Sequence, residues 1–510
     1  MIDLTRHRAE QPAVICDGQA WTYGELHRRA LRIARNLAAV GLEPGDRIAT
    51  LLPNSLELVA LYLAAFRGGF TIVPLDARYH SAQISFALRH SGASAVVTAP
   101  DRVEDVALTE SGREIEHFYV TGSDVPEGYG SFRRLLRTRP TAELREDFRD
   151  DDISVVFYTS GTTARPKGVT LTRTAIASSI GKANAVLRLN PDDVTLIAAP
   201  ISRPMALRTQ LLTSLEAGGT IVLLNGFNAE NYLQTLAEHP NVSFLALLPA
   251  ALRSILFHDD FEIEHLRKLR LAICGGDYVP LELFKKFNEL TGLELTEQCG
   301  MTETGMYAVN PPYGRKKRGS IGHPYYGAQV TIIDSRGRDV PWGEAGEIAV
   351  RSPFAMDGYW NDTAATRRVM RDGWIRTGDI GRFDDDGFLW LDGRKKDIIV
   401  RGGSNISPAA VEAVLQQHPF VKEACVVGVE DEEFGQAVSA FVTLHDVADV
   451  EHAETELESL AARELPDYMV PQSICALPKL PRTGSGKVDR ERLKWVAESS
   501  DDETLAILLD

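Results

Sequence analysis

One short segment of the chain concentrates the side chains that could hold a polyphosphate. Tyr158-Thr-Ser-Gly-Thr-Thr-Ala-Arg-Pro-Lys-Gly168 directly follows the apolar run 154–158, which predicts a buried strand. Backbone N–H groups freed by a glycine, several hydroxyls and one ammonium are suitable phosphate donors. These candidates are Thr159, Ser160, Gly161, Thr162, Thr163 and Lys167. The segment is not a Walker A loop, because Lys167 precedes Gly168 where that loop needs Gly-Lys-Ser/Thr. A Ser/Thr-rich surface turn is the alternative interpretation.

Two further segments carry oxygen groups suited to a nucleotide. In Gly300-Met-Thr-Glu303, Glu303 offers a hard oxygen ligand for Mg²⁺, and Thr302 can donate to a phosphate. Asp379 ends Trp374-Ile-Arg-Thr-Gly-Asp379 and can accept hydrogen bonds from two neighbouring ribose hydroxyls. Without the other segments, the Thr-Glu pair would fit an exposed surface and Asp379 a turn cap.

Basic residues in two turns complete this set. Arg394 lies in the charged turn 392–397 and fits a ribose or phosphate contact, although such turns are usually just solvated. Lys487 ends the glycine-flanked turn Gly484-Ser-Gly-Lys487, which is not a nucleotide loop because residue 481 is proline. A mobile exposed lysine is the alternative.

The order and spacing of these segments resemble the ANL superfamily of adenylate-forming enzymes, which includes acyl-CoA synthetases, adenylation domains and luciferases. The resemblance rests on seven segments: 66–76, 158–168, 300–303, 343–347, 374–379, 393–408 and 481–487. It implies that ATP activates a carboxylic acid as an acyl-adenylate with release of pyrophosphate. A thiol then takes the acyl group. The implied cofactors are ATP, Mg²⁺ and coenzyme A.

The resemblance also implies roles for individual residues. Glu303 would bind the metal and Thr302 the α-phosphate, while Lys487 would contact both the carboxylate and the α-phosphate as pyrophosphate leaves. Lys396 matches the hinge about which a small domain rotates between two catalytic poses. The expected nucleotide pocket further includes Gly275, Gly276, Cys299, Gly300, Asp379 and Arg394.

The expected substrate pocket comprises Arg203, Asp277 and Gly300. Cys299 and Arg203 depart from the family pattern, and the role of Asp277 is open. Cys299 stands where many members have an aromatic residue that stacks on adenine. Arg203 stands where acyl-CoA synthetases often have histidine, and its planar guanidinium suits a carboxylate. Arg203 therefore predicts a small or polar acid, unless it turns to solvent or pairs with a local acid. Asp277 could contact an amino group or cap the next helix, at Val279-Pro280.

Several functions remain open at this point. The acceptor could be coenzyme A, a separate carrier protein or an amine, and some relatives activate nitrite in place of a carboxylate. The substrate is then a small carboxylate, aryl or polar, or another small oxyanion. A nucleotide-binding protein that has lost catalysis is the alternative from another class, although the presence of Lys487, Glu303 and Asp379 counts against it.

The elements that position these residues follow an α/β pattern. Thr22 and Glu25 form a capping signal before the helical run 26–40, which ends at Gly41. Strands are expected at 47–52, 94–98, 154–158, 220–224 and 269–273, several of them apolar on both faces. We expect a large multi-sheet N-terminal domain, 1–394, and a small mobile α+β domain, 395–510, with the hinge near Lys396.

Composition excludes several other classes. The 510 residues include 55 Lys+Arg and 71 Asp+Glu, a net charge of −16, which disfavours binding to nucleic acid or an anionic membrane. No apolar run approaches the roughly 18 residues that a membrane span needs. The five cysteines form no C-x-x-C pair, which favours a reducing cytoplasm over disulfides or structural zinc. His258 and His265 fit a solvated face better than a metal site.

Overall fold

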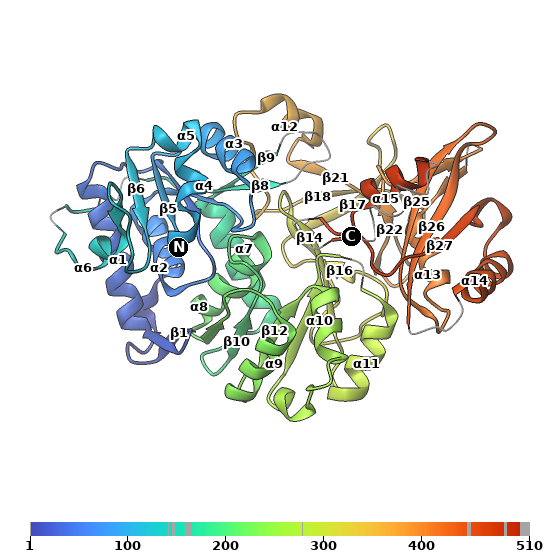
Figure 1. The fold of residues 1–510 in the computed structure, drawn as a ribbon, viewed down its shortest axis with the longest axis horizontal. Helices are drawn as coiled ribbons and strands as arrows, with labels where there is room; N and C mark the ends of the chain where they lie inside the picture. The colour runs from blue at the N-terminus through green and yellow to red at the C-terminus, as the bar shows by residue number, and fades with distance from the viewer. Residues whose placement is uncertain are drawn as a thin grey trace. The chain divides into compact units, whose positions relative to one another are not determined.

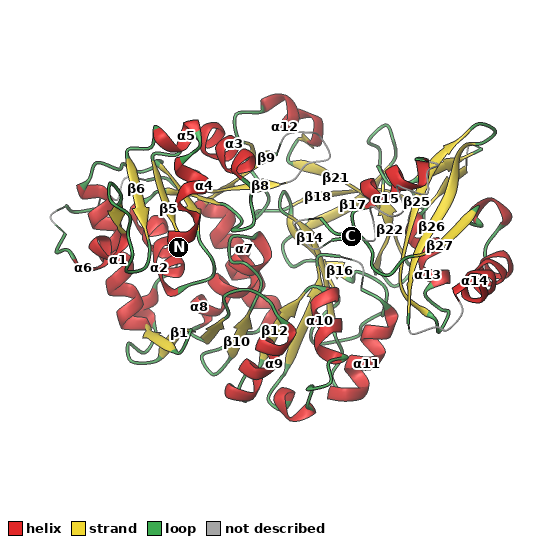
Figure 2. Cartoon of the chain, viewed as in Figure 1, coloured by secondary structure: helices red, strands yellow, loops and turns green. Residues whose placement is uncertain are grey.

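The chain folds into alternating helices and strands, which confirms the predicted α/β class (Figures 1 and 2). The computed structural model describes residues 2–140, 142–144, 148–159, 166–277, 279–402, 404–445, 450–483 and 487–499. The chain divides into two compact units. Unit 1 comprises Met1–Val330 and Val350–Arg376, and unit 2 comprises Thr331–Ala349 and Thr377–Asp510. The hinge expected near Lys396 stays a prediction.

The larger sheet of unit 1 has nine strands in the order β16-β15-β14-β13-β12-β10-β11-β1-β2. The strands from β14 to β1 are parallel, so their carboxyl ends meet at one edge. Their bounds are β1 Pro12–Cys16, β2 Gln19–Thr22, β10 Val194–Ile197, β11 Thr220–Leu223, β12 Phe244–Leu247, β13 Leu271–Gly275, β14 Thr296–Met301, β15 Gly305–Val309 and β16 His323–Pro324.

The second sheet of unit 1 has eight strands in the order β19-β9-β8-β4-β3-β5-β6-β7. It places β9 between β8 and the short strand β19, which comes from a distant part of the chain. The bounds are β3 Arg47–Leu51, β4 Thr71–Pro74, β5 Ala95–Thr98, β6 His117–Val120, β7 Gly130–Ser131, β8 Ile153–Thr159, β9 Lys167–Thr172 and β19 Gly358–Tyr359.

Helices cover both faces of these sheets. Leu56–Gly68 (α2) is buried along nearly its whole length and contacts both β1 and β4, one strand of each sheet. It packs with Tyr23–Ala39 (α1), whose cap has the predicted reciprocal bonds between Thr22 and Glu25. On the outer face of the nine-stranded sheet pack α9 Ala229–Glu238, α10 Pro249–Leu256 and α11 Leu281–Thr291 (Figure 1). The other helices of unit 1 are η1 Leu4–Arg6, α3 Ser81–Ser91, η2 Pro100–Arg102, α4 Val103–Ala107, α5 Glu110–Arg113, α6 Phe132–Arg137, α7 Arg173–Leu187, the π-helix η3 Met205–Leu212, α8 Thr213–Ala217, η4 Ile263–Leu266 and α12 Thr363–Val369.

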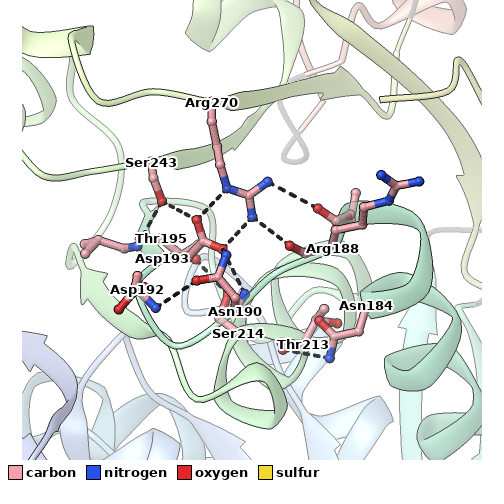
Figure 3. A network of polar contacts seen from close by, with 12 residues as sticks. Asn184, Arg188, Asn190, Asp192, Asp193, Thr195, Thr213, Ser214, Ser243 and Arg270 are labelled. Atoms are coloured by element: carbon pink, nitrogen blue, oxygen red, sulfur yellow. Dashed lines mark hydrogen bonds and ion pairs between the residues drawn. The ribbon is translucent and has the colours of Figure 1, made fainter. Parts of the chain in front are cut away.

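A polar network ties together the beginnings of three parallel strands (Figure 3). Asp193 precedes β10, and its buried carboxylate accepts hydrogen bonds from Arg270 before β13 and from Ser243 before β12. Ser243 in turn accepts the Val194 N–H at 3.0 Å. Because these contacts lie at the amino ends of the strands, they fix the sheet at the edge opposite the strand ends described below.

Unit 2 has its own core, in which Pro408–Leu415 (α13) and Val450–Glu464 (α14) pack on a three-stranded sheet. That sheet has the order β25-β26-β27, with β25 Val421–Asp431, β26 Gly435–Leu444 and β27 Ser473–Ala476. A two-stranded sheet pairs β23 Ile399–Arg401 with β24 Ser404–Ile406, and the remaining helices are η5 Asp467–Met469 and α15 Arg490–Glu498.

A further five-stranded sheet comprises β17 Gln329–Ile333, β18 Gly346–Arg351, β20 Met370–Arg371, β21 Trp374–Phe383 and β22 Leu389–Arg394.

The strands expected at 47–52, 94–98, 154–158, 220–224 and 269–273 are confirmed as β3, β5, β8, β11 and β13, with ends shifted by one or two residues. Strand β3 shows why such runs are apolar on both faces: Ile48 packs in one core cluster, and Ala49 and Leu51 in another. None of the helices in the described part of the chain combines the length and apolarity that crossing a membrane requires.

Candidate active site

The carboxyl ends of β13 and β14 lie side by side and carry one group of candidates. Gly275 ends β13 opposite Gln298, and a Cβ atom at Gly275 would lie 2.2 Å from the Gln298 carbonyl oxygen. Only glycine permits this approach. Gly276 follows with φ +84°, so the chain turns sharply away from the strand end. Open parallel sheets bind ligands at such carboxyl ends.

A tight turn after β14 carries the next group. Strand β14 pairs with β15 with a register shift between Cys299 and Gly300, and a Cβ at Gly300 would lie 2.6 Å from the Gly305 carbonyl oxygen. The turn presents Thr302 and Glu303. Glu303 is buried, and its Oε1 accepts a hydrogen bond from the Tyr359 hydroxyl at 3.0 Å. Burial and the neighbouring Glu303 carboxylate raise the pKa of Tyr359, so its hydroxyl stays protonated and can donate.

Cys299 contacts a neighbouring tyrosine. Its thiol lies 3.1 Å from the Tyr307 hydroxyl, and Tyr307 is fully buried on β15. The tyrosine therefore packs next to the position where many family members have their aromatic residue.

The two ends of the predicted phosphate segment lie on the paired antiparallel strands β8 and β9. Thr159 at the end of β8 pairs with Lys167 at the start of β9. Ser160, Gly161, Thr162 and Thr163 lie outside the described residues. The Lys167 ammonium lies 4.9 Å from the centre of the Tyr359 ring, within range of a cation–π contact. Tyr359 thus contacts both Lys167 and Glu303, although sequence analysis did not select it.

Arg203 pairs with a local acid, one of the alternatives that the sequence left open. Its Nε and Nη2 donate to the same Asp76 oxygen at 3.0 and 2.8 Å, and Arg78 donates to both oxygens of this carboxylate. Burial opposes the charge of Asp76, but the hydrogen bonds from Arg78 and the charge of Arg203 lower its pKa to about 2. The carboxylate is therefore ionised and doubly paired at neutral pH.

Asp277 is exposed, and both of its predicted roles stay predictions. Helix α11 begins at Leu281, with Pro280 at its N-cap and no side-chain hydrogen bond to the cap. The proline supplies a fixed φ but no acceptor, and the distance along the chain places Asp277 before the first turn.

In unit 2, Asp379 and Arg394 face each other across the β21–β22 pair. The Arg394 Nε lies 3.1 Å from the Asp379 Oδ1, and the two residues are in register. Asp379 is buried, and its N–H donates to the Thr377 hydroxyl at 3.0 Å. Asp379 therefore lies within a strand, and a turn-cap role does not fit it.

Lys396 and Lys487, the two candidate lysines of unit 2, are exposed. Lys396 Nζ lies 3.7 Å from the Asp397 Oδ1. The Lys487 carbonyl accepts the Thr483 N–H at 2.8 Å, while 484–486 lie outside the described residues.

Among the described residues no group of three or more His, Cys, Asp or Glu side chains is arranged to hold a metal ion. His258 and His265 instead lie near the exposed carboxylates of Asp260 and Glu262. Glu303 supplies a carboxylate and Thr302 a hydroxyl, a donor set that fits Mg²⁺ arriving with phosphates and waters better than a resident ion.

Within this α/β fold, Lys167 at the start of one strand and the buried Glu303 of the other sheet both contact Tyr359, a combination of groups suited to a Mg²⁺-bound nucleotide. The protein-family model for AMP-binding enzymes matches residues 3–360, and the family model for the AMP-binding enzyme C-terminal domain matches residues 410–487. The chain belongs to this family and, with it, to the ANL superfamily of adenylate-forming ligases.

Several similar proteins that cover nearly the whole chain are coenzyme A ligases, and another, 31% identical over 96% of this chain, is a fatty acid–acyl-carrier-protein ligase of Streptomyces coeruleorubidus. The chain is 34% identical to a feruloyl-CoA synthase of an Amycolatopsis species, covering 93% of this chain and 94% of the relative. It is 34% identical to a 2-succinylbenzoate–CoA ligase of Bacillus licheniformis, covering 95% and 96%. A solved anthranilate CoA ligase, AuaEII, in complex with anthranoyl-AMP superposes with a TM-score of 0.91 at 27% identity, covering 99% and 97%. The enzyme is thus an adenylate-forming ligase that activates a carboxylic acid with ATP.

Proposed function

We propose that this enzyme is an aryl-acid–coenzyme A ligase, with the catalytic residues that the sequence selected. The relatives named above carry feruloyl, succinylbenzoate and anthranilate in their names, and each of these acids contains an aromatic ring. Because the Arg203 guanidinium already pairs with the Asp76 carboxylate of the protein, the proposal rests on the aromatic ring of the acid and not on a second anionic group.

The close approach of Gly275 to Gln298 is the observation that carries the assignment of the nucleotide pocket. Because Gly275 pairs with Gln298, Gly276 and Cys299 follow at the same pair of strand ends, where the backbone around the glycines would offer room for the nucleotide. Adenine would lie against this part of the backbone.

Groups at the edge of that pocket would bind the triphosphate. Thr302 would donate to the α-phosphate, and Glu303 would hold Mg²⁺, which supplies charge neutralisation on the phosphates when bound. Lys167 would contact the outer phosphates, with the hydroxyls of Thr159, Ser160, Thr162 and Thr163 and the N–H groups around Gly161.

Asp379 would accept both ribose hydroxyls, and Arg394 would orient it. The Arg394 Nε, 3.1 Å from the Asp379 Oδ1, would hold the buried carboxylate in place to accept two hydroxyl donors.

In the first half-reaction a substrate carboxylate oxygen attacks the α-phosphorus of ATP, and the bond to pyrophosphate breaks. Lys487 would stabilise the charge that develops on both groups. In the second, the coenzyme A thiol attacks the acyl carbonyl, its proton is lost to solvent, and AMP leaves. We propose that residues 395–510 rotate about Lys396 between these steps, with residues 1–394 as the larger domain. A carrier protein or an amine is the alternative acceptor.

Release of AMP and pyrophosphate across a panel of aryl, aliphatic and dicarboxylic acids and nitrite, each with and without coenzyme A, tests the proposal. We expect an aryl acid to give the highest kcat/KM, with AMP turnover that rises when coenzyme A is added. Turnover with nitrite or aliphatic acids only, or turnover indifferent to coenzyme A, would contradict it. No release with any acid would indicate a catalytically silent nucleotide-binding protein.

A further inference from the structure

Tyr359 is fixed in place by its backbone on two sides. It lies on β19, where it pairs with Val169 of β9, and its N–H donates to the Thr366 hydroxyl at 2.9 Å. The next residue, Trp360, donates its N–H to the Gly168 carbonyl at 2.7 Å. The strand that begins with Lys167 therefore also determines where the tyrosine ring stands.

The segment that includes Tyr359 holds Glu303 at two points. The Met356 N–H donates to the Glu303 carbonyl at 2.7 Å, and the Tyr359 hydroxyl donates to Glu303 Oε1 at 3.0 Å. Both side chains are buried, with exposed fractions of 9% and 8%. The terminal torsion of a glutamate is soft, so a buried hydrogen bond to one oxygen decides how the carboxylate is turned.

The same aromatic ring contacts Lys167 through its face, at 4.9 Å from the ammonium. One side chain thus touches the proposed metal ligand through its hydroxyl and the proposed phosphate lysine through its ring. Because the two targets come from different sheets of unit 1, a rigid bridge between them sets their separation.

We propose that Tyr359 is a positioning residue that aligns Glu303 with Lys167 for the Mg²⁺-bound triphosphate. The proposal rests on the proposed function, since it assumes that these two residues receive the metal and the phosphates. Outer hydrogen-bond partners of metal ligands typically change metal affinity by about 10- to 100-fold when removed.

Two substitutions separate the two contacts. Tyr359→Phe keeps the ring and removes the hydroxyl, and Tyr359→Leu removes both. Tyr232→Phe is the matched control, because Tyr232 is fully buried on α9, away from these residues, and its hydroxyl has no hydrogen-bond partner among the described residues. Thermal unfolding of each purified variant shows whether the fold is kept.

Calorimetric titration with a non-hydrolysable ATP analogue, with Mg²⁺ and with EDTA, gives a readout independent of turnover. We expect Tyr359→Phe to weaken binding about 10-fold with Mg²⁺ and to leave binding in EDTA unchanged. Tyr359→Leu should weaken both. The Mg²⁺ concentration for half-maximal pyrophosphate release should rise in Tyr359→Phe, with the KM for the acid unchanged.

Glu303→Gln distinguishes failure of this proposal from failure of the proposed function. If Glu303→Gln loses the Mg²⁺-dependent affinity while Tyr359→Phe behaves like Tyr232→Phe, Tyr359 only packs and the positioning role is wrong. If Glu303→Gln keeps that affinity, the metal assignment itself is wrong, and with it the role of Tyr359. If the double variant Tyr359→Phe/Glu303→Gln loses no more Mg²⁺-dependent affinity than Glu303→Gln alone, Tyr359 acts through Glu303.

Discussion

Arg203 directs two donors at a single oxygen of Asp76, at 3.0 and 2.8 Å, across 127 positions of sequence. The Asp76 carboxylate is nearly inaccessible, whereas the arginine side chain is about one third exposed. This pair joins the segment after β4 to the segment after β10, one from each sheet of unit 1. The ion pair therefore links the two sheets of unit 1.

Replacing Arg203 with alanine should lower stability and leave acid selectivity unchanged. Asp76 keeps Arg78 but loses its other partner, so we expect a loss of about 1–3 kcal/mol in the free energy of unfolding. Because the pKa of Asp76 is lowered to about 2, the stabilisation is complete above its ordinary value of 3.8 and is lost as pH falls toward 2. Denaturant unfolding at pH 7 and pH 3 measures both effects. A KM that rises only for dicarboxylates would instead make Arg203 a substrate contact.

Glu297 should make the enzyme less stable as pH rises. Its carboxyl is buried on β14, and burial raises its pKa from 4.5 to about 8. Between these values the folded chain keeps a proton that the unfolded chain has released, so stability falls with rising pH through this window. Glu297→Gln should remove this slope, which for the wild type amounts to about 4 kcal/mol of lost stability between pH 4.5 and pH 7.5. Unfolding curves from pH 5 to 8.5 test this, and an unchanged slope would refute it.

Arg208 is a buried cation that lacks an acidic partner among the described residues. It donates to the Ser179 hydroxyl and the Phe354 carbonyl, and burial lowers its pKa to about 10. Arg208→Met should be nearly neutral or stabilising because it removes a buried charge, whereas Arg208→Ala should cost about 3 kcal/mol through the cavity it leaves. If Arg208→Met and Arg208→Ala lower the thermal stability equally, the hydrogen bonds of the guanidinium contribute more to stability than its burial costs.

Lys487→Ala should abolish most adenylation without affecting the fold. The side chain is exposed, so its loss leaves no cavity, but we expect pyrophosphate release to fall about 10²- to 10³-fold. Lys494→Ala is a suitable control, because Lys494 lies seven positions away on α15 and its ammonium lies 3.6 Å from the Glu498 carboxylate on the same helix. A Lys487→Ala variant as fast as this control would remove Lys487 from the catalytic set.

Local sequence signals were sufficient to predict the helices and strands. They were not sufficient to predict contacts between residues far apart in the sequence. The cap of α1 needs only Thr22 and Glu25, three residues apart, and the predicted capping box is present. The contact of Tyr359 with Glu303 joins residues 56 positions apart, and no spacing rule connects them. The same holds for Arg203, whose pairing was one of two open interpretations.

The buried thiols have a chemical consequence for an enzyme that makes activated acyl groups. Burial raises the pKa of Cys16 to about 12, raises that of Cys274 well above its ordinary value, and raises that of Cys475. Mixed anhydrides and thioesters acylate thiolates, and these cysteines stay protonated at neutral pH. The enzyme is thereby spared self-acylation at these positions, and a colorimetric thiol reagent that follows coenzyme A consumption should meet little background from them.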